Sequence, residues 1–292
     1  MISFNRVGRG ICNSSFGEII QGCKITNENF LISLPIKLIS SCKISLEKIQ
    51  APLIVECSRE KTKNLITILL QKINLSWGYY VKCSIYSDIP ISKGLSSSTA
   101  DMVAAVRAIE NLFNVIFDKN FISQIFKIIE PHEGLHYEAC NLYDHVKGKL
   151  LIDFKYIPDF YILAIDRGGF IDTLEYNKTS KYSLDQKKKS EKNLKKTIKA
   201  FKEKNDIDIA KCATTSSKIL AERLNYNFNI KAIQFIDRVK SLGLISSHSG
   251  TFVGFIYEKK NYRIQDLKKY KSIIEKKFKK KVKIYETVNY VY

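Results

Sequence analysis

The chain has 292 residues, 45% of them hydrophobic and 26% charged, with a formal net charge of +19. This length fits a two-domain enzyme or two small domains with a real core. The longest apolar runs, such as LITILL, are far shorter than the ~20 residues that cross a bilayer, and no signal peptide is expected at the N-terminus. Seven cysteines without a CxxC pair indicate reduced thiols in a cytoplasmic protein and argue against a disulfide framework or a zinc ribbon.

The high positive charge raises the question of a nucleic-acid partner. Lysines concentrate in residues 187–204 and 259–283, where apolar residues recur between them at helical spacing. That pattern is typical of the solvated outer face of a helix, so the distribution argues against nucleic acid. A basic nucleic-acid-binding protein stays open as an alternative of another class, since charge alone indicates only solubility and weak polyanion binding.

Apolar and polar residues alternate in some segments, which predicts strands, and recur at helical spacing in others, which predicts helices. The expected strands are residues 30–47, 79–90, 161–166 and 282–291, with a strand, a turn and a second strand over 244–258. The expected helices are 62–73, 98–113, 119–129, one or two helices after 182, 229–243 with Gly243 as its C-terminal stop, and 266–278. Strands in series before helices indicate an α+β fold. We expect one domain over residues 1–157 and a second over 158–292.

Residues 88–108, DIPISKGLSSSTADMVAAVRA, give the clearest signal of a site. Gly94 lets the backbone come close to a ligand, and the first-turn amides of the following helix lack helical partners. These amides and the helix dipole favour a phosphate, and Lys93 adds positive charge. The hydroxyls that can add hydrogen bonds or reach a metal are those of Ser96, Ser97, Ser98 and Thr99. An ordinary capped helix after a tight turn is the alternative, because this is not a Walker A loop.

PISKGLSSSTA resembles the second motif of the GHMP kinases (galactokinase, homoserine kinase, mevalonate kinase and phosphomevalonate kinase), P-x-x-x-G-L-[GS]-S-S-[AST]-A. The resemblance implies a two-domain fold, ribosomal-protein-S5-like at the N-terminus and ferredoxin-like at the C-terminus, with ATP between the domains. It also implies that Ser98 contacts Mg²⁺, and we expect a catalytic contribution from Lys93. The nucleotide-binding residues that it implies are Gly94, Leu95, Ser96, Ser97, Ser98 and Thr99.

Two further segments resemble the first and third motifs of that family. SSFGEIIQG supplies Glu18 and Gln21 near the N-terminus, and GLISSHSGTFVGF supplies only Gly250 and Gly254 beyond its first residue near the C-terminus. The first motif lacks the usual A-P or P-G opening, and the third departs strongly from the mevalonate kinase form. Both versions are similar to the branch that contains L-threonine kinases of cobalamin metabolism. The resemblance implies a substrate site made by Glu18, Gln21 and the segment Ser247, His248 and Ser249.

EPHEGLHY, residues 130–137, resembles the E-P-x-D-G-x-x-Y segment of the same branch, with Glu133 in place of the Asp. By this resemblance Glu130 is the acidic Mg²⁺ ligand that accompanies Ser98. Glu133 is the nearest candidate for a general base. DRGGFIDTLEYN, residues 166–177, is also similar to a stretch of this branch. Asp101 has two interpretations, a first-turn carboxylate that opposes the helix dipole or a catalytic or metal-binding group.

His132 to His136 spell H-E-x-x-H, a signature of zinc proteases in which both histidines lie on one face of a helix. The context is poor, because Gly134 costs ~1 kcal/mol inside a helix and the helix would have to begin at Pro131. A metzincin would need its third histidine at position 142, which is Leu142. A zinc hydrolase is therefore a second alternative of another class.

The sequence thus predicts an ATP- and Mg²⁺-dependent kinase that phosphorylates the hydroxyl group of a small molecule. L-threonine is the favoured acceptor, and homoserine, a sugar or an isoprenoid alcohol are the alternatives. The expected partners are ATP and the small-molecule substrate, with no membrane and no nucleic acid. The oligomeric state is open between a monomer and a homodimer.

Overall fold

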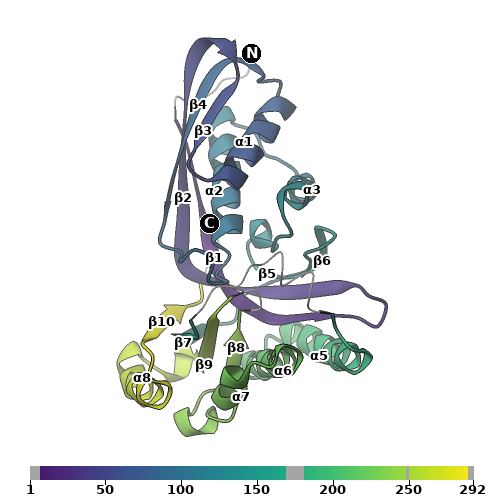
Figure 1. Ribbon diagram of the computed structural model, residues 1–292, viewed down its shortest axis with the longest axis vertical. Coiled ribbons are helices and arrows are strands. Elements are labelled where there is room, and N and C mark those ends of the chain that lie inside the picture. Colours follow the sequence, from purple (N-terminus) through teal and green to yellow (C-terminus); the bar gives the residue numbers. More distant parts are fainter. Residues whose placement is uncertain (1–6, 169–180, 248–249, 289–292) are drawn as a thin grey trace.

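A computed structural model of the protein describes residues 7–168, 181–247 and 250–288 (Figure 1). In these ranges the strands are β1 Val7–Cys23, β2 Asn29–Pro52, β3 Ile54–Cys57, β4 Trp77–Ser87, β5 Cys140–Asp144, β6 Lys149–Tyr156, β7 Phe160–Asp166, β8 Gly243–Ser246, β9 Phe252–Glu258 and β10 Val282–Glu286. The helices are α1 Glu60–Lys72, α2 Ser97–Phe113, α3 Lys119–Ile129, α5 Leu184–Lys202, α6 Asp206–Leu224, α7 Asn227–Ile233 and α8 Ile264–Phe278, with 3₁₀ turns at Leu135–Tyr137, Asp237–Val239 and Lys259–Asn261. The combination confirms an α+β fold.

The long strand β1 connects the two ends of the sheet. The strand order is β10-β7-β9-β8-β1-β2-β4-β3, with β5 and β6 attached through β2. β1 pairs antiparallel with β2 along most of its length and reaches β8 where Glu18 pairs with Ser246. Figure 1 shows the β1–β2 ribbon bending from the part that carries α1 and α2 to the part that carries α5 and α6. Residues far apart in the chain therefore meet around the middle of β1.

Two hydrophobic clusters hold the sheet and helices together. The larger cluster packs α2 against β1 and β2 and extends to α5 and α6, with Met102, Val103 and Leu194 among its members. The second cluster packs β7 and β9 against α8, and includes Phe255 and Ile274. The predicted boundary at residues 157/158 falls between β6 and β7, and it stays a prediction.

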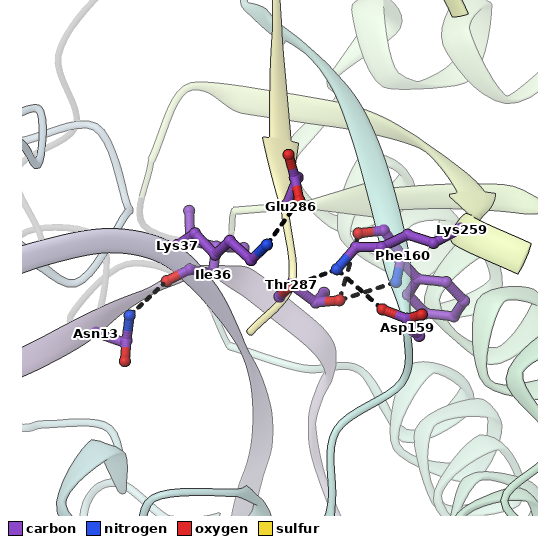
Figure 2. A network of polar contacts seen from close by, with 8 residues as sticks. All are labelled: Asn13, Ile36, Lys37, Asp159, Phe160, Lys259, Glu286 and Thr287. Atoms are coloured by element: carbon purple, nitrogen blue, oxygen red, sulfur yellow. Dashed lines mark hydrogen bonds and ion pairs between the residues drawn. The ribbon is translucent and has the colours of Figure 1, made fainter. Parts of the chain in front are cut away.

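A network of polar contacts joins β2 to the C-terminal strands (Figure 2). The Lys37 ammonium lies 2.9 Å from a carboxylate oxygen of Glu286 at the end of β10. The Phe160 N–H donates to Thr287 Oγ1 at 2.8 Å, and Lys259 donates to the Thr287 carbonyl at 2.8 Å. These contacts fix the start of β7 relative to β2, and so contribute to holding the two parts of the molecule in one arrangement.

Most predicted elements are confirmed, and one helix is wrong. The pattern over residues 229–243 forms only the short α7 and a 3₁₀ turn, and Gly243 begins β8 instead of ending a helix. Gly243 packs on α6, because a Cβ there would lie 2.4 Å from the carbonyl oxygen of Ala210. Two helices, α5 and α6, follow residue 182, and the last predicted strand ends at Glu286. The sequence did not reveal β1, β3, β5 or β6.

None of the described helices combines the length and apolar character needed to cross a membrane. All seven cysteines are free thiols, and only Cys57 is not buried.

Candidate active site

The loop before α2 has an unusual backbone. Three of its residues have positive φ angles, namely Ser92 (58°), Gly94 (75°) and Ser96 (57°). The residues between them, 93 and 95, do not. Alternation of left-handed residues with others turns successive backbone N–H groups toward one side, which makes a concave anion-binding surface. α2 begins at Ser97, immediately after this loop. The loop N–H groups and the first turn of α2 therefore form one site suited to phosphate.

Ser96 is the N-cap residue of α2, but its side chain does not cap the helix. Its hydroxyl bonds instead to Oε2 of Glu133. The first-turn N–H groups of α2 therefore receive no side-chain cap from Ser96 and keep their capacity to bind a ligand.

Glu133 joins three segments of the chain. Its Oε2 accepts hydrogen bonds from Ser15 of β1 at 2.8 Å and from Ser33 of β2 at 3.0 Å, in addition to Ser96. Burial raises the pKa of Glu133 and these hydroxyls oppose the rise. The general-base role of Glu133 stays a prediction, and the geometry favours an organising role, because one of its carboxylate oxygens is already saturated with donors.

Ser98 and Glu130, the predicted metal ligands, lie in contact. The Ser98 hydroxyl donates to Oε1 of Glu130, and the Lys61 ammonium of α1 pairs with Oε2 of the same carboxylate. A hydroxyl and a carboxylate are the oxygen ligands that Mg²⁺ prefers, and Mg²⁺ commonly keeps several waters beside one or two protein ligands. The two residues fit a magnesium site that is completed by water and phosphate.

These groups line one cavity of about 440 Å³. All of the predicted nucleotide-binding residues, 94–99, contribute to its wall, as do Glu130 and Glu133. Arg59, the N-cap residue of α1, and Lys61 in its first turn line the cavity, and Glu18 and Gln21 line it from β1. The structure therefore brings the first and second motifs, more than 70 residues apart in the sequence, to the same space.

Glu18 is 5% exposed and lies in β1 where that strand meets β2 and β8. Gly17 allows β1 to come close to the third motif. Its φ is +53°, and a Cβ at this position would lie 2.7 Å from the Ser247 Cα. The Ser247 hydroxyl bonds to the backbone of Phe252 and so stabilises the turn. His248 and Ser249 lie outside the described residues.

Lys93 does not line the cavity. Its ammonium lies 2.9 Å from Asp166 at the end of β7. Its carbonyl accepts a hydrogen bond from the Thr251 N–H at 3.3 Å, and Arg167 donates to the Gly250 carbonyl at 2.8 Å. In this geometry Lys93 anchors the loop to the third motif, and its catalytic role stays a prediction.

Asp101 also reaches the cavity wall. The Ser40 hydroxyl donates to its Oδ1 at 2.5 Å, and the Arg59 guanidinium lies 3.5 Å from its Oδ2. Burial raises the pKa of Asp101, and these two partners oppose the rise. The sequence did not identify Ser40, Arg59 or Lys61, because single serines and basic residues in common segments carry no distinctive pattern.

The zinc-hydrolase alternative is contradicted by the backbone, because His132 to His136 do not lie on an α-helix and only Leu135–Tyr137 form a 3₁₀ turn. Nε2 of His132 bonds to Tyr143 at 2.7 Å, and Nε2 of His136 bonds to Ser123 at 2.8 Å. Burial lowers the pKa of His132 to about 3, so the ring is neutral. Within the described residues there is no cluster of three or more histidine, cysteine or acidic residues that could hold a metal. His132 and His145, which the sequence connected only with the zinc-hydrolase alternative, line the cavity.

Comparison with solved structures confirms the predicted fold. The homoserine kinase from Cytophaga hutchinsonii superimposes with a TM-score of 0.70 at 12% identity, over 99% of this chain and 96% of that one. The mevalonate kinase of Methanococcus jannaschii also gives a TM-score of 0.70, at 16% identity, over 98% of this chain and 99% of that one. This likeness shows the two-domain α+β fold of these enzymes.

Sequence comparison gives the family. The GHMP kinases N terminal domain matches residues 61–136, which include α1, α2 and Glu130. The L-threonine kinases of Citrobacter freundii and Salmonella typhimurium are each 24% identical to this chain, over 88% of it, and the matches cover 88% and 85% of those proteins. Residues 61–136, which match this domain, contribute the phosphate loop, Glu130 and Glu133 to the cavity described above, and the comparisons support the identification of the chain as an ATP-dependent kinase of the GHMP type.

Proposed function

We propose that this GHMP kinase transfers the γ-phosphoryl group of ATP to the hydroxyl of L-threonine and forms O-phospho-L-threonine, in the cytoplasm. The observation that carries the proposal is the shared cavity, in which the phosphate loop and the buried carboxylate of Glu18 form parts of one wall. The similarity to two L-threonine kinases over 88% of the chain supports the choice of acceptor. The basic surface has no part in this proposal.

The nucleotide phosphates are proposed to lie on the loop formed by residues 92–96 and on the first turn of α2. Ser98 and Glu130 would hold Mg²⁺, which when bound neutralises charge on the phosphates. Glu133 accepts a hydrogen bond from the Ser96 hydroxyl and so keeps this side chain from capping α2. The first-turn N–H groups of α2 are then available to bind the phosphates. Gly250 packs against the backbone of Lys93 and Gly94 and so supports the loop.

The acceptor is proposed to lie at the β1 end of the cavity. A hydroxy-amino acid carries an ammonium group, and Glu18 is a carboxylate with little exposure to water, so the two charges compensate each other. Gln21 adds an amide for the other polar groups of the acceptor. A sugar or an isoprenoid alcohol has no ammonium, and homoserine, which has one, is the closest competitor.

In the reaction, the acceptor oxygen bonds to the γ-phosphorus, the bond from that phosphorus to the β-γ bridging oxygen breaks, and ADP leaves. Catalysis of this transfer depends on alignment and on neutralising charge. The residues of this chain supply both, since the loop and Glu18 hold the two reactants against each other. The hydroxyl proton leaves to water or to phosphate, and no side chain is assigned to take it.

The test is ADP release with ATP, Mg²⁺ and a panel of acceptors, namely L-threonine, L-serine, L-homoserine, galactose and mevalonate. Mass spectrometry should detect O-phospho-L-threonine, and L-threonine should have the highest kcat/KM. N-acetyl-L-threonine, which keeps the hydroxyl but lacks the ammonium, should be a much poorer substrate. Efficient turnover of galactose or mevalonate without turnover of any amino acid would refute the assignment of the acceptor and leave the kinase family intact.

A further inference from the structure

Both oxygens of the Glu130 carboxylate have partners from this chain. Oε1 accepts from the Ser98 hydroxyl and Oε2 pairs with the Lys61 ammonium. The Glu130 side chain is 17% exposed, whereas the Lys61 side chain is 52% exposed and lines the cavity. The cation is therefore the more exposed member of the pair, and the carboxylate is the more buried one.

The stability of the protein does not explain this position of Lys61. An ion pair with a half-exposed lysine contributes little to the free energy of unfolding. Lys61 also lies in the first turn of α1, where the helix dipole disfavours a cation. A role toward a ligand accounts for a cation at this position, because the cavity that Lys61 lines is the one that ends at the phosphate loop.

Lys61 and a divalent cation compete for the same carboxylate. A metal that binds to Glu130 in the absence of nucleotide has to displace the ammonium, which then loses the carboxylate with which it pairs. Nucleotide changes this balance, because its phosphates offer the displaced ammonium a second anion within the same cavity. A flexible four-carbon side chain can make this exchange without movement of the backbone.

We propose that Lys61 exchanges partners during binding: it neutralises Glu130 in the free enzyme and pairs with the nucleotide phosphates once a divalent cation binds to Glu130 and Ser98. This inference rests on the proposed function of the cavity as a nucleotide site. Its consequence is thermodynamic coupling, in which the metal favours nucleotide binding and nucleotide favours metal binding by the same factor. Lys61 then prevents the site from filling with metal alone.

The other cations near the loop do not fit this role. Arg59 pairs with Asp101, whose carboxylate also bonds to Ser40 and does not contact the Ser98–Glu130 pair that is assigned to Mg²⁺. Lys93 pairs with Asp166 and does not line the cavity. Among the ion pairs described, the Lys61–Glu130 pair alone combines a cavity-lining cation with a predicted metal ligand.

The test compares Lys61→Met with Lys72→Met, which removes the same charge from the exposed far end of the same helix. Electron paramagnetic resonance measures Mn²⁺ binding without nucleotide, and calorimetry measures ATP binding with and without Mg²⁺. Lys61→Met should bind free Mn²⁺ more tightly than the wild type. It should bind ATP in the presence of Mg²⁺ roughly tenfold more weakly, through loss of one charge-assisted contact. Lys72→Met should match the wild type in all three measurements.

Unchanged Mn²⁺ affinity in Lys61→Met would overturn the inference, and so would a loss of Mn²⁺ affinity. In a Glu130→Gln background, Lys61→Met should no longer change Mn²⁺ binding, because the competition requires the carboxylate. Lys61→Arg should restore the coupling in part. The binding readouts do not depend on the acceptor, so failure of L-threonine turnover and failure of the Lys61 exchange are distinguishable results.

Discussion

Gly94 of the phosphate loop and Gly250 of the third motif pack directly against each other. A Cβ on Gly94 would lie 2.6 Å from the Gly250 Cα, and a Cβ on Gly250 would lie 2.2 Å from the carbonyl oxygen of Lys93. Both obstacles are backbone atoms, which cannot rotate away as a side chain can. The third motif therefore supports the loop from behind, and this packing needs a glycine on each side.

Gly250→Ala should weaken both the fold and nucleotide binding. The methyl group forces the loop to shift, and overpacking of this kind costs about 1–3 kcal/mol. Thermal unfolding should show a lower Tm without ligand and a reduced rise in Tm with ATP and Mg²⁺. Gly78→Ala is the control, because a Cβ at Gly78 meets nothing closer than 3.7 Å and the cost of that substitution comes from the positive φ of Gly78, +85°, instead of from packing. That variant should lower the Tm slightly and keep the full ATP response.

Glu133→Gln and Glu133→Ala should differ in activity. The Gln side-chain oxygen can still accept from Ser15, Ser33 and Ser96, so an organising role predicts a kcat within about tenfold of the wild type, the scale of one weakened hydrogen bond. Ala removes the acceptor, and Ser96 should then become free to cap α2, with a larger loss of kcat and of ATP affinity. If Glu133 were instead the general base, Gln and Ala would lose kcat alike and ATP affinity would be kept.

Glu18→Gln should raise the KM for L-threonine much more than the KM for ATP. The variant leaves the substrate ammonium without a counter-charge in a buried place, a loss on the order of several kcal/mol. Steady-state kinetics with each substrate varied in turn measures the two effects. Glu28→Gln, in the exposed turn after β1, removes a carboxylate that pairs with Lys24 and should leave both KM values unchanged. Equal KM values for L-threonine in Glu18→Gln and the wild type would remove Glu18 from the acceptor site.

Stability should fall as the pH falls from about 6.5 toward 4. Burial lowers the pKa of His132 to about 3 and that of His145 to about 4, so the folded protein keeps both rings neutral while the unfolded chain binds protons below its ordinary histidine pKa of 6.5. The unfolded state then binds more protons, and the free energy of unfolding decreases with falling pH. Urea unfolding at pH 7, 6 and 5 measures this slope, which His132→Gln should reduce. A slope unchanged by that substitution would show that His132 is not among the groups responsible.

The phosphate loop could be predicted from the sequence because its signals are local. Gly94, the serines and the helix that follows are neighbours in the chain, and the backbone conformation depends mainly on them. The supports of this loop could not be predicted in the same way. Ser15, Ser33 and Glu133 meet only after β1, β2 and the segment after α3 have packed together, and each is an ordinary polar residue in its own segment.

The strand β1 shows the same limit at the level of the fold. Its residues 7–23 are rich in small and polar residues, and their burial comes from β2, β8 and α2 on either side. A pattern that is completed by distant elements is not visible in one segment. Residues 229–243, conversely, have a helical pattern but do not form one helix. Gly243, at the end of this pattern, packs closely on α6 and begins β8.

The pairing of Glu18 with Ser246 has a consequence for the protein during its synthesis. The residues of the nucleotide loop are synthesised more than 140 residues before β8 and Gly250. A nascent chain that has already made the loop therefore lacks both the strand beside its acceptor carboxylate and the glycine behind its phosphate site. Chains that terminate before β8 therefore lack part of the site and should have no kinase activity.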